Sequence, residues 1–285
     1  MKPAGSFQTL ISVAELQSMG TSALVIDTRF DLSDTEAGRL AYEQAHLPSA
    51  HYLHLDKDLS GSKTDAEGRF KGRHPLPERE RFAEGMRQLG LNSGMQVVVY
   101  DAQGGMYAAR LWWMLRWIGH SQVAVLDGGL QAWQSAGAPM SKERPEPQAG
   151  NFILADSVMA SLTADQLQAR LGTVRLIDAR APERFRGEVE PLDSKAGHIP
   201  GASNRLFKNN LQDDGRFKSA ELLRAEFMAL MAPFSVTEVV HQCGSGVTAC
   251  HNLLAMQHAG LAGALLYPGS WSEWSADPAR PVATA

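Results

Sequence analysis

Both cysteines of the 285-residue chain lie in the segment HQCGSGVTAC, residues 241–250. Cys243 follows an apolar run and precedes Gly244, Ser245 and Gly246, whose small side chains leave the backbone accessible. Consecutive N–H groups can therefore turn towards the sulfur, and the helix expected next adds the partial positive charge of its N-terminus. Both effects stabilise a thiolate, and equally a sulfur anion attached to it. The segment predicts a nucleophilic cysteine held in an anion-binding loop.

Two other kinds of site use similar residues. A cysteine-dependent phosphatase needs an arginine six positions after the cysteine to hold the phosphate, and this chain has Ala249 there. A metal site would have to use His241, Cys243, Cys250 and His251. Their order lacks paired Cys-x2-Cys spacing, and the last two would point to different faces of a helix. We therefore expect no metal, and we interpret Cys250 as a small buried residue.

The segments that position this loop occur twice along the chain. Four motifs keep their order, at separations of 151, 152, 142 and 141 positions. The pairs are ALVIDTRF at 23–30 with VRLIDARA at 174–181, AHLPSA at 45–50 with GHIPGA at 197–202, VVVYDAQGGMYAA at 97–109 with VVHQCGSGVTAC at 239–250, and VLDGGLQAW at 125–133 with LYPGSWSEW at 266–274. The repeat sets Asp101 opposite Cys243, and the second copy is about ten residues shorter between its second and third motifs. Internal repeats of this kind predict duplicated structural units.

Each copy has the usual size of a domain. We predict a first domain at 1–140, a linker at 141–150 that is rich in proline and charge, and a second domain at 151–285. Short apolar runs, typical of buried strands, alternate with helical patterns in both copies. The expected strands are 24–28, 96–101, 122–127, 175–179, 238–243 and 264–269, and the expected helices include 107–120 and 247–260, with Ser12 and Thr163 as N-caps of two more. This alternation predicts an α/β fold, with a mainly parallel sheet flanked by helices in each domain.

Composition and charge narrow the setting. The net charge is −4, with acidic and basic residues mixed, which gives no reason to expect nucleic acid or an anionic membrane as partner. No apolar stretch is long enough to cross a bilayer, and polar residues interrupt the first twenty, unlike a signal peptide. Two cysteines seven residues apart on one expected helix are badly placed to form a disulfide. We expect a cytoplasmic protein in which Cys243 is a free thiol.

Duplicated domains marked by LIDAR, GHIPGA and a strand–Cys–loop–helix segment resemble the two-domain rhodanese-type sulfurtransferases. The resemblance spans almost the whole chain. It implies that only the second domain carries the nucleophile, with an aspartate at that place in the first, as Asp101 is here. It further implies transfer of a sulfane sulfur from a small-molecule donor to Cys243 as a persulfide, and then to thioredoxin, a small thiol or cyanide, without metal or organic cofactor.

The loop CGSGVTA resembles the 3-mercaptopyruvate sulfurtransferase branch, whereas thiosulfate enzymes typically place basic residues directly after the cysteine. Thiosulfate is a dianion that gains from such cations, while mercaptopyruvate brings one carboxylate and needs a polar group near its thiol. The resemblance implies that Ser245 acts with His74 of GRHPLP and Asp56 of HLDKD, both from the first domain. It also places the backbone of Gly244, Gly246, Val247 and Thr248 around the substrate.

An arginine from the second domain should bind the substrate carboxylate, because a guanidinium can donate two hydrogen bonds to it. The stretch RFRGEVEP at 184–191 carries Arg184 at the matching position. The chain departs from the family further along, because the usual second arginine falls around Leu192 and Asp193. The alternative for Arg184 and Arg186 is a solvated surface pair.

Other functions remain open at this point. One alternative is a thiosulfate:cyanide sulfurtransferase, and another is a non-catalytic persulfide carrier or redox-sensing binding protein. Asp178, Arg180, His198 and His46 recur in the motifs, and we interpret them as structural.

Overall fold

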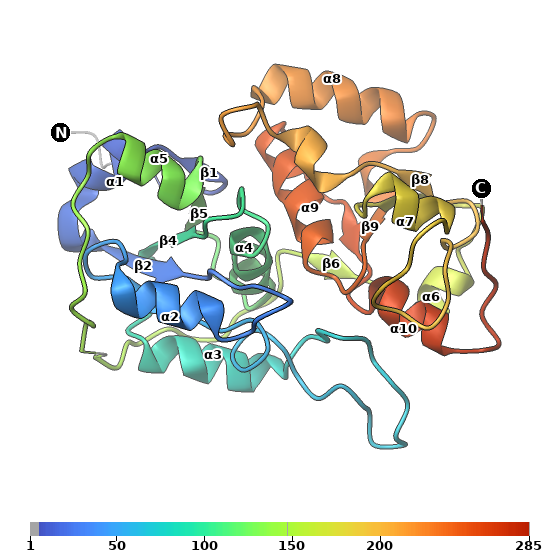
Figure 1. The fold of residues 1–285 in the computed structure, drawn as a ribbon, viewed down its shortest axis with the longest axis horizontal. Helices are drawn as coiled ribbons and strands as arrows, with labels where there is room; N and C mark the ends of the chain where they lie inside the picture. Colours follow the sequence, from blue (N-terminus) through green and yellow to red (C-terminus); the bar gives the residue numbers. More distant parts are fainter. Residues whose placement is uncertain (1–5, 147, 285) are drawn as a thin grey trace. The chain divides into compact units, whose positions relative to one another are not determined.

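Two parallel sheets organise the chain in a computed structural model, which describes residues 6–146 and 148–284 (Figure 1). The residues divide into two units by their contacts. The first unit takes its residues from 1–59, 77–158 and 213–217, and the second takes 60–76, 159–212 and 218–285. The predicted linker at 141–150 includes residue 147, which lies outside the described residues.

The first sheet has five strands in the order β1-β5-β4-β2-β3, and every pairing is parallel. In the central pair Val25 is in register with Val98. The strand bounds are Leu10–Ile11 for β1, Ala23–Asp27 for β2, His51–Tyr52 for β3, Gln96–Tyr100 for β4 and Val123–Leu126 for β5. The three longer strands, β2, β4 and β5, are buried throughout, which agrees with their continuous apolar sequence.

The second sheet repeats the arrangement in the order β6-β10-β9-β7-β8, again with parallel pairings only. Ile177 is in register with His241 in its central pair. The bounds are Ala160–Ser161 for β6, Arg175–Asp178 for β7, Ser203–Asn204 for β8, Val239–Gln242 for β9 and Leu265–Leu266 for β10. The prediction of two α/β domains with parallel sheets is confirmed.

Helices flank both sheets. In the first unit they are α1 Val13–Met19, α2 Ala37–Gln44, α3 Arg79–Gln88, α4 Ala108–Trp117 and α5 Gly129–Ser135. In the second they are α6 Ala164–Gln168, α7 Pro182–Arg186, α8 Ala220–Met231, α9 Thr248–His258 and α10 Ser270–Ala276. Ser12 and Thr163 form capping boxes with Glu15 and Gln166, so both predicted N-caps are confirmed. Short 3-10 turns occupy Gly20–Ser22, Phe207–Asn210 and Val236–Glu238.

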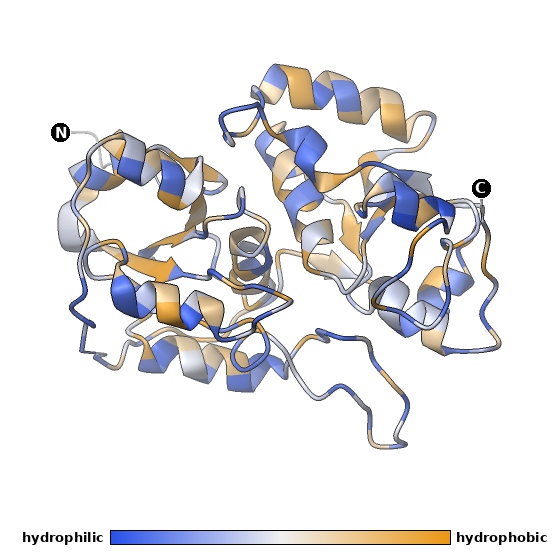
Figure 2. Cartoon of the chain, viewed as in Figure 1, coloured by the Kyte–Doolittle hydropathy of each residue, from blue (hydrophilic) through white to orange (hydrophobic). Residues whose placement is uncertain are grey.

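The two cores are built alike. One face of the first sheet packs with α1, α2 and α5 in a cluster that ends at Trp133, and one face of the second packs with α6 and α10 around Trp271 and Trp274. Figure 2 shows the strands as apolar, while the helices mix apolar and polar residues. Burying these faces supplies the main driving force for folding.

One loop from each copy belongs to the opposite unit. Residues 60–76, named here the 60–76 arm, come from the first copy and belong to the second unit. Residues 213–217 come from the second copy and belong to the first unit, where Phe217 N–H donates to Asp127 Oδ1 at 2.9 Å. Sequence patterns gave no sign of this exchange.

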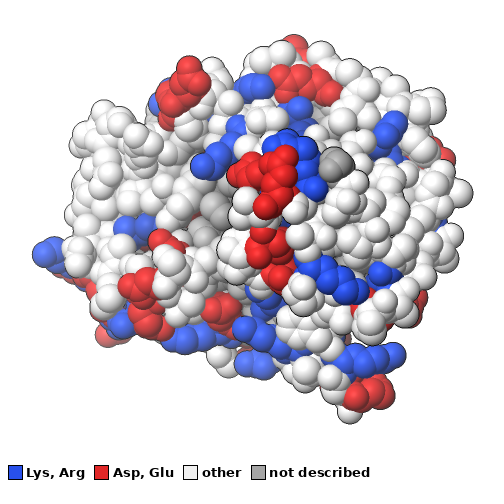
Figure 3. Space-filling model, turned by 45° about the vertical axis from the view of Figure 1, so that its right-hand side comes forward, with Lys and Arg blue, Asp and Glu red and all other residues white. Residues whose placement is uncertain are grey.

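Charge is dispersed over the surface drawn in Figure 3, where acidic and basic side chains are interspersed. None of the described helices combines the length and the apolar character that crossing a membrane requires.

Candidate active site

Cys243 directly follows β9, and α9 begins five residues later at Thr248. The cysteine is 2% exposed, and Val247 beside the helix start is also buried. Gly246 has φ +76°, and a side chain there would begin 2.2 Å from the carbonyl oxygen of Pro268. Only glycine fits this turn, which brings the loop back over the end of the sheet. The loop thus lies where ligands bind in open α/β sheets.

The start of α10 fixes the cysteine loop through backbone hydrogen bonds. Cys243 N–H donates to Ser270 Oγ at 3.1 Å, and its carbonyl accepts from Trp271 N–H at 3.0 Å. Gly244 carbonyl accepts from Ser272 N–H at 2.9 Å. Ser270 has φ +54°, a left-handed conformation that is costly for a residue with a side chain. Sequence reasoning missed Ser270 and Ser272, since nothing local distinguishes them from other serines.

The first unit shows what the equivalent loop binds. Asp101, which the repeat aligns with Cys243, is fully buried with its carboxylate inside the loop. Its two oxygens accept four backbone N–H groups, from Gln103 at 2.9 Å, Gly105 at 2.8 Å, Tyr107 at 2.8 Å and Ala108 at 3.0 Å. A loop of this family of shapes therefore surrounds a negative group with N–H donors.

Ser245 and His74 lie together, although the sequence separates them widely. His74 Nδ1 is 2.8 Å from Ser245 Oγ, and the imidazole tautomer decides which atom donates. His74 comes from the 60–76 arm, which approaches α10 closely, since Gly72 has φ +101° and a side chain there would begin 2.9 Å from Gly269 O. The structure thus brings together two of the three residues predicted to act with Cys243.

Asp56, the third of these residues, belongs to the first unit. There its backbone N–H donates to His54 Nδ1 at 3.1 Å. A role beside His74 stays a prediction.

Arg184 is mostly buried on α7 and does not form a solvated pair with Arg186. Its Nη2 donates to Glu190 at 2.6 and 2.9 Å and to Asp193 Oδ2 at 3.1 Å. Its Nη1 is 3.4 Å from the position where a side chain on Gly244 would begin. Arg186 is different, because it is exposed and paired with Glu188 at 2.7 Å. Of the two arginines, the contacts described here bring only Arg184 to the cysteine loop.

Arg73, in the 60–76 arm, is a neighbour of this loop that sequence reasoning missed. Its Nη2 lies 2.7 Å from the position where a side chain on Gly244 would begin. Its Nη1 forms an ion pair with Asp193. The only available signal was its place next to His74, and long-range packing decides where such an arginine points.

The motif residues interpreted as structural make internal contacts. Asp178 and Arg180 form a buried ion pair at 2.7 Å, and Arg180 also donates to Gly197 O at 2.8 Å. His198 stacks on Phe185 with ring centroids 3.9 Å apart. His46 makes the equivalent stacking contact with Tyr42 in the first unit, also at 3.9 Å.

Other residues near the cysteine show no metal-binding arrangement. Cys250 is buried and its Sγ donates to Gly246 O at 3.3 Å. His241 Nε2 lies 2.9 Å from Met256 Sδ, and burial lowers the pKa of His241 to about 3. Among the described residues, no group of three or more His, Cys, Asp or Glu side chains is arranged to hold a metal ion.

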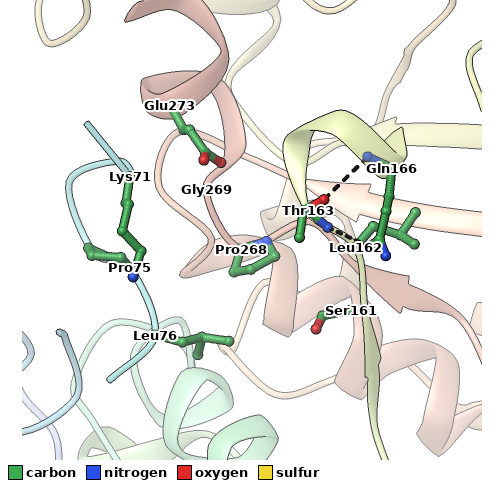
Figure 4. Close-up of a pocket in the computed structure, with 10 residues that line it drawn as sticks. All are labelled: Lys71, Pro75, Leu76, Ser161, Leu162, Thr163, Gln166, Pro268, Gly269 and Glu273. Atoms are coloured by element: carbon green, nitrogen blue, oxygen red, sulfur yellow. Dashed lines mark hydrogen bonds between the residues drawn. The ribbon is translucent and has the colours of Figure 1, made fainter. Parts of the chain in front are cut away.

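A cavity of about 210 Å³ lies in the second unit beside the start of α10 (Figure 4). Lys71 and Glu273 face it from the arm and from α10, and Thr163 and Gln166 border it from α6. Burial raises the pKa of the Glu273 carboxyl. The cavity adjoins the cysteine loop through Pro268, against which Gly246 packs.

Comparison with known protein families gives one match for each copy. The family described as "Rhodanese-like domain" matches residues 12–136 and 163–277. Both matched segments contain the loop between strand and helix that holds Asp101 in one copy and Cys243 in the other.

Individual relatives cover nearly the whole chain. A protein of Pseudomonas aeruginosa named as a probable 3-mercaptopyruvate sulfurtransferase is 47% identical over 264 residues, or 92% of each chain. A thiosulfate sulfurtransferase of Cricetulus griseus is 37% identical over 268 residues, covering 90% of this chain and 86% of the relative. The solved structure of SseA from Escherichia coli, described among 3-mercaptopyruvate sulfotransferases, matches with a TM-score of 0.79 and 30% identity, covering 93% of this chain and 100% of that one.

Proposed function

This chain belongs to the rhodanese family, whose domain it carries twice, and on that premise we propose that it transfers sulfur from 3-mercaptopyruvate through a persulfide on Cys243. It is an enzyme of the sulfurtransferase kind. The observation that carries the choice of donor is the Ser245–His74 pair, 2.8 Å apart and two residues beyond the cysteine in the loop.

The first step forms one bond and breaks one. The Cys243 thiolate attacks the sulfur of mercaptopyruvate, a bond forms between the two sulfurs, and the bond from sulfur to carbon breaks. The electron pair of the broken bond leaves on carbon as the enolate of pyruvate, which then takes up a proton. Ser245 and His74 can move that proton, because a hydroxyl–imidazole pair accepts and donates without net charge separation.

The product of this step is a persulfide anion, which needs stabilisation. The carboxylate of Asp101 in the first unit accepts four backbone N–H groups from the corresponding loop. By analogy, the N–H groups that follow Cys243, including those of Gly244, Gly246, Val247 and Thr248, bind the outer sulfur. Donors fixed in place in this way stabilise a developing anion without reorganisation.

The second step returns the enzyme to its starting state. An acceptor thiolate attacks the outer sulfur of the persulfide, the sulfur–sulfur bond breaks, and its electron pair stays on Cys243. The acceptor leaves as a persulfide, or as thiocyanate where cyanide attacks. We propose a small thiol or thioredoxin as acceptor and the cytoplasm as the setting, which the two free, buried cysteines favour.

The charges around the loop favour one carboxylate over a dianion. No Lys or Arg lies between Cys243 and Thr248 in sequence. Arg184 is available beside the loop, but Glu190 and Asp193 already offset its charge. Thiosulfate, with two negative charges, gains less from such a neutralised surrounding than mercaptopyruvate, with one.

A parallel steady-state assay of mercaptopyruvate and thiosulfate tests the proposal. We expect a higher kcat/KM for mercaptopyruvate. A preference for thiosulfate would replace this donor by the alternative, and a persulfide that forms without turnover would indicate a sulfur carrier.

A further inference from the structure

Two guanidinium groups, not one, border the loop that carries the nucleophile. The position where a side chain on Gly244 would begin lies 2.7 Å from Arg73 Nη2 and 3.4 Å from Arg184 Nη1. The absence of a side chain at 244 is what permits this approach. Arg73 comes from the 60–76 arm and Arg184 from α7, so two separate segments place positive charge at the residue after Cys243.

The nitrogen that each arginine turns towards the loop is not used elsewhere. Asp193 pairs with Nη1 of Arg73 and with Nη2 of Arg184, and Glu190 also binds Nη2 of Arg184. Among the described residues, no hydrogen bond uses Nη2 of Arg73 or Nη1 of Arg184. These are the two nitrogens nearest Gly244.

Asp193 holds this pair in position. Its side chain is 4% exposed and it accepts from both arginines, so neither guanidinium can turn away without losing a charged hydrogen bond. A like-charged pair of arginines repels, and the carboxylate between them offsets that repulsion. The result is two fixed donors with a gap on the side of the cysteine loop.

The backbone also fixes Arg73. Its N–H donates to Ser272 Oγ at 3.1 Å, and the next residue, His74, contacts Ser245. Gly72, just before it, packs against Gly269 in a conformation that favours glycine. Arg73 is therefore anchored by both neighbours, unlike an arginine at the end of a free surface loop.

We propose that Arg73 is the second cation of the substrate-carboxylate site, binding the donor together with Arg184. This rests on the proposed function, since it assumes a donor with a carboxylate. The two oxygens of that carboxylate accept from Arg73 Nη2 and Arg184 Nη1, which places the thiol end of the donor towards Cys243. The chain thus supplies from the 60–76 arm the cation that its α7 region lacks, where Asp193 instead orients both arginines.

The test compares donors that differ only in the carboxylate. Steady-state kinetics are measured with mercaptopyruvate and with 1-mercaptopropan-2-one, which lacks it. We expect Arg73→Gln to lower kcat/KM for mercaptopyruvate by about tenfold to a hundredfold, the range for a lost charged hydrogen bond, and to leave the ketone within about twofold. Arg184→Gln should give the same pattern, Arg73→Lys a smaller loss, and Arg186→Gln no change. Equal losses on both donors, or none, would overturn the assignment.

A binding measurement separates this proposal from the proposed function. Titration calorimetry with pyruvate on the Cys243→Ser variant reports carboxylate binding without turnover. Adding Arg73→Gln should raise the dissociation constant for pyruvate by about tenfold or more. An unchanged constant contradicts a role in carboxylate binding, even if the enzyme uses mercaptopyruvate. If the unmodified enzyme does not turn over mercaptopyruvate, the proposed function fails, and the calorimetry still decides the role of Arg73.

Discussion

His74 Nδ1 lies 2.8 Å from Ser245 Oγ across a sequence separation of 171 residues. Because the 60–76 arm belongs to the second unit, this contact is internal to the unit that holds Cys243. The pair is therefore part of the same packed structure as the nucleophile.

Removing either member of this pair should affect the two donors differently. We expect Ser245→Ala and His74→Ala each to lower kcat for mercaptopyruvate by about a hundredfold to ten-thousandfold, the usual contribution of proton transfer. Thiosulfate loses sulfite, which needs no proton, so its turnover should be retained. Stopped assays of pyruvate and sulfite release measure both. Equal losses on the two donors would rule out the proton-transfer role.

The two cysteines should separate cleanly. Cys243→Ser should abolish sulfur transfer with the fold intact, because the nucleophile is lost and the volume is kept. Cys250→Ser should keep most activity, since Cys250 donates to Gly246 O and a hydroxyl can do the same. Mass spectrometry after donor treatment should find one added sulfur, about 32 Da, on the peptide bearing Cys243. A label on Cys250 would contradict the assignment.

Ser270 should act as a positioning residue for the cysteine loop. Its φ of +54° suits glycine, and Gly129 has φ +55° at the aligned place in the first unit. Ser270→Gly therefore relieves about 1 kcal/mol of backbone strain while deleting the Oγ that accepts from Cys243 N–H. We expect a melting temperature close to the unmodified protein and a kcat lowered about tenfold for both donors, as for a small misplacement of the nucleophile.

The control for this variant is Ser270→Ala. It keeps the strained conformation and also loses the hydroxyl, so it should be less stable than Ser270→Gly by about 1 kcal/mol. If Ser270→Gly turns over both donors at the original rate, the hydroxyl does not position the loop.

Acid should destabilise the second unit through His241. Burial lowers the pKa of this histidine from 6.5 to about 3, so below pH 6.5 the unfolded chain takes up a proton that the folded chain does not. Stability is then lost as the pH falls through this range. Between pH 7 and pH 5, His241 should remove about 2 kcal/mol of unfolding free energy. Urea titrations should show a smaller loss for His241→Leu, and parallel losses would mean that His241 does not titrate as described.

Local patterns predicted much of the fold. The apolar runs around Val25, Val98 and Val240 identified the central strands, because a strand buried on both faces must be apolar throughout. The N-caps at Ser12 and Thr163 were equally readable, since a cap bonds to its own first turn. Each of these signals needs only neighbouring residues.

The site was only partly readable for the opposite reason. Cys243 announced itself by its small neighbours, and motif order paired His74 with Ser245. Arg73 and Ser270 did not, because one depends on where the 60–76 arm packs and the other on a backbone angle that its residue type disfavours. Tertiary packing decides both, and neither leaves a periodic trace in sequence.

The exchange of loops makes the halves of this chain mutually dependent. The catalytic unit takes His74 and Arg73 from residues 60–76, so a fragment starting at the predicted second domain, 151–285, contains Cys243 but neither of these residues. The first copy is about ten residues longer between its shared motifs, within the interval that contains the arm. A duplication followed by lengthening of that loop would let one copy keep the nucleophile and the other keep its partners. The copy without a cysteine would then be retained by selection on activity as well as on stability.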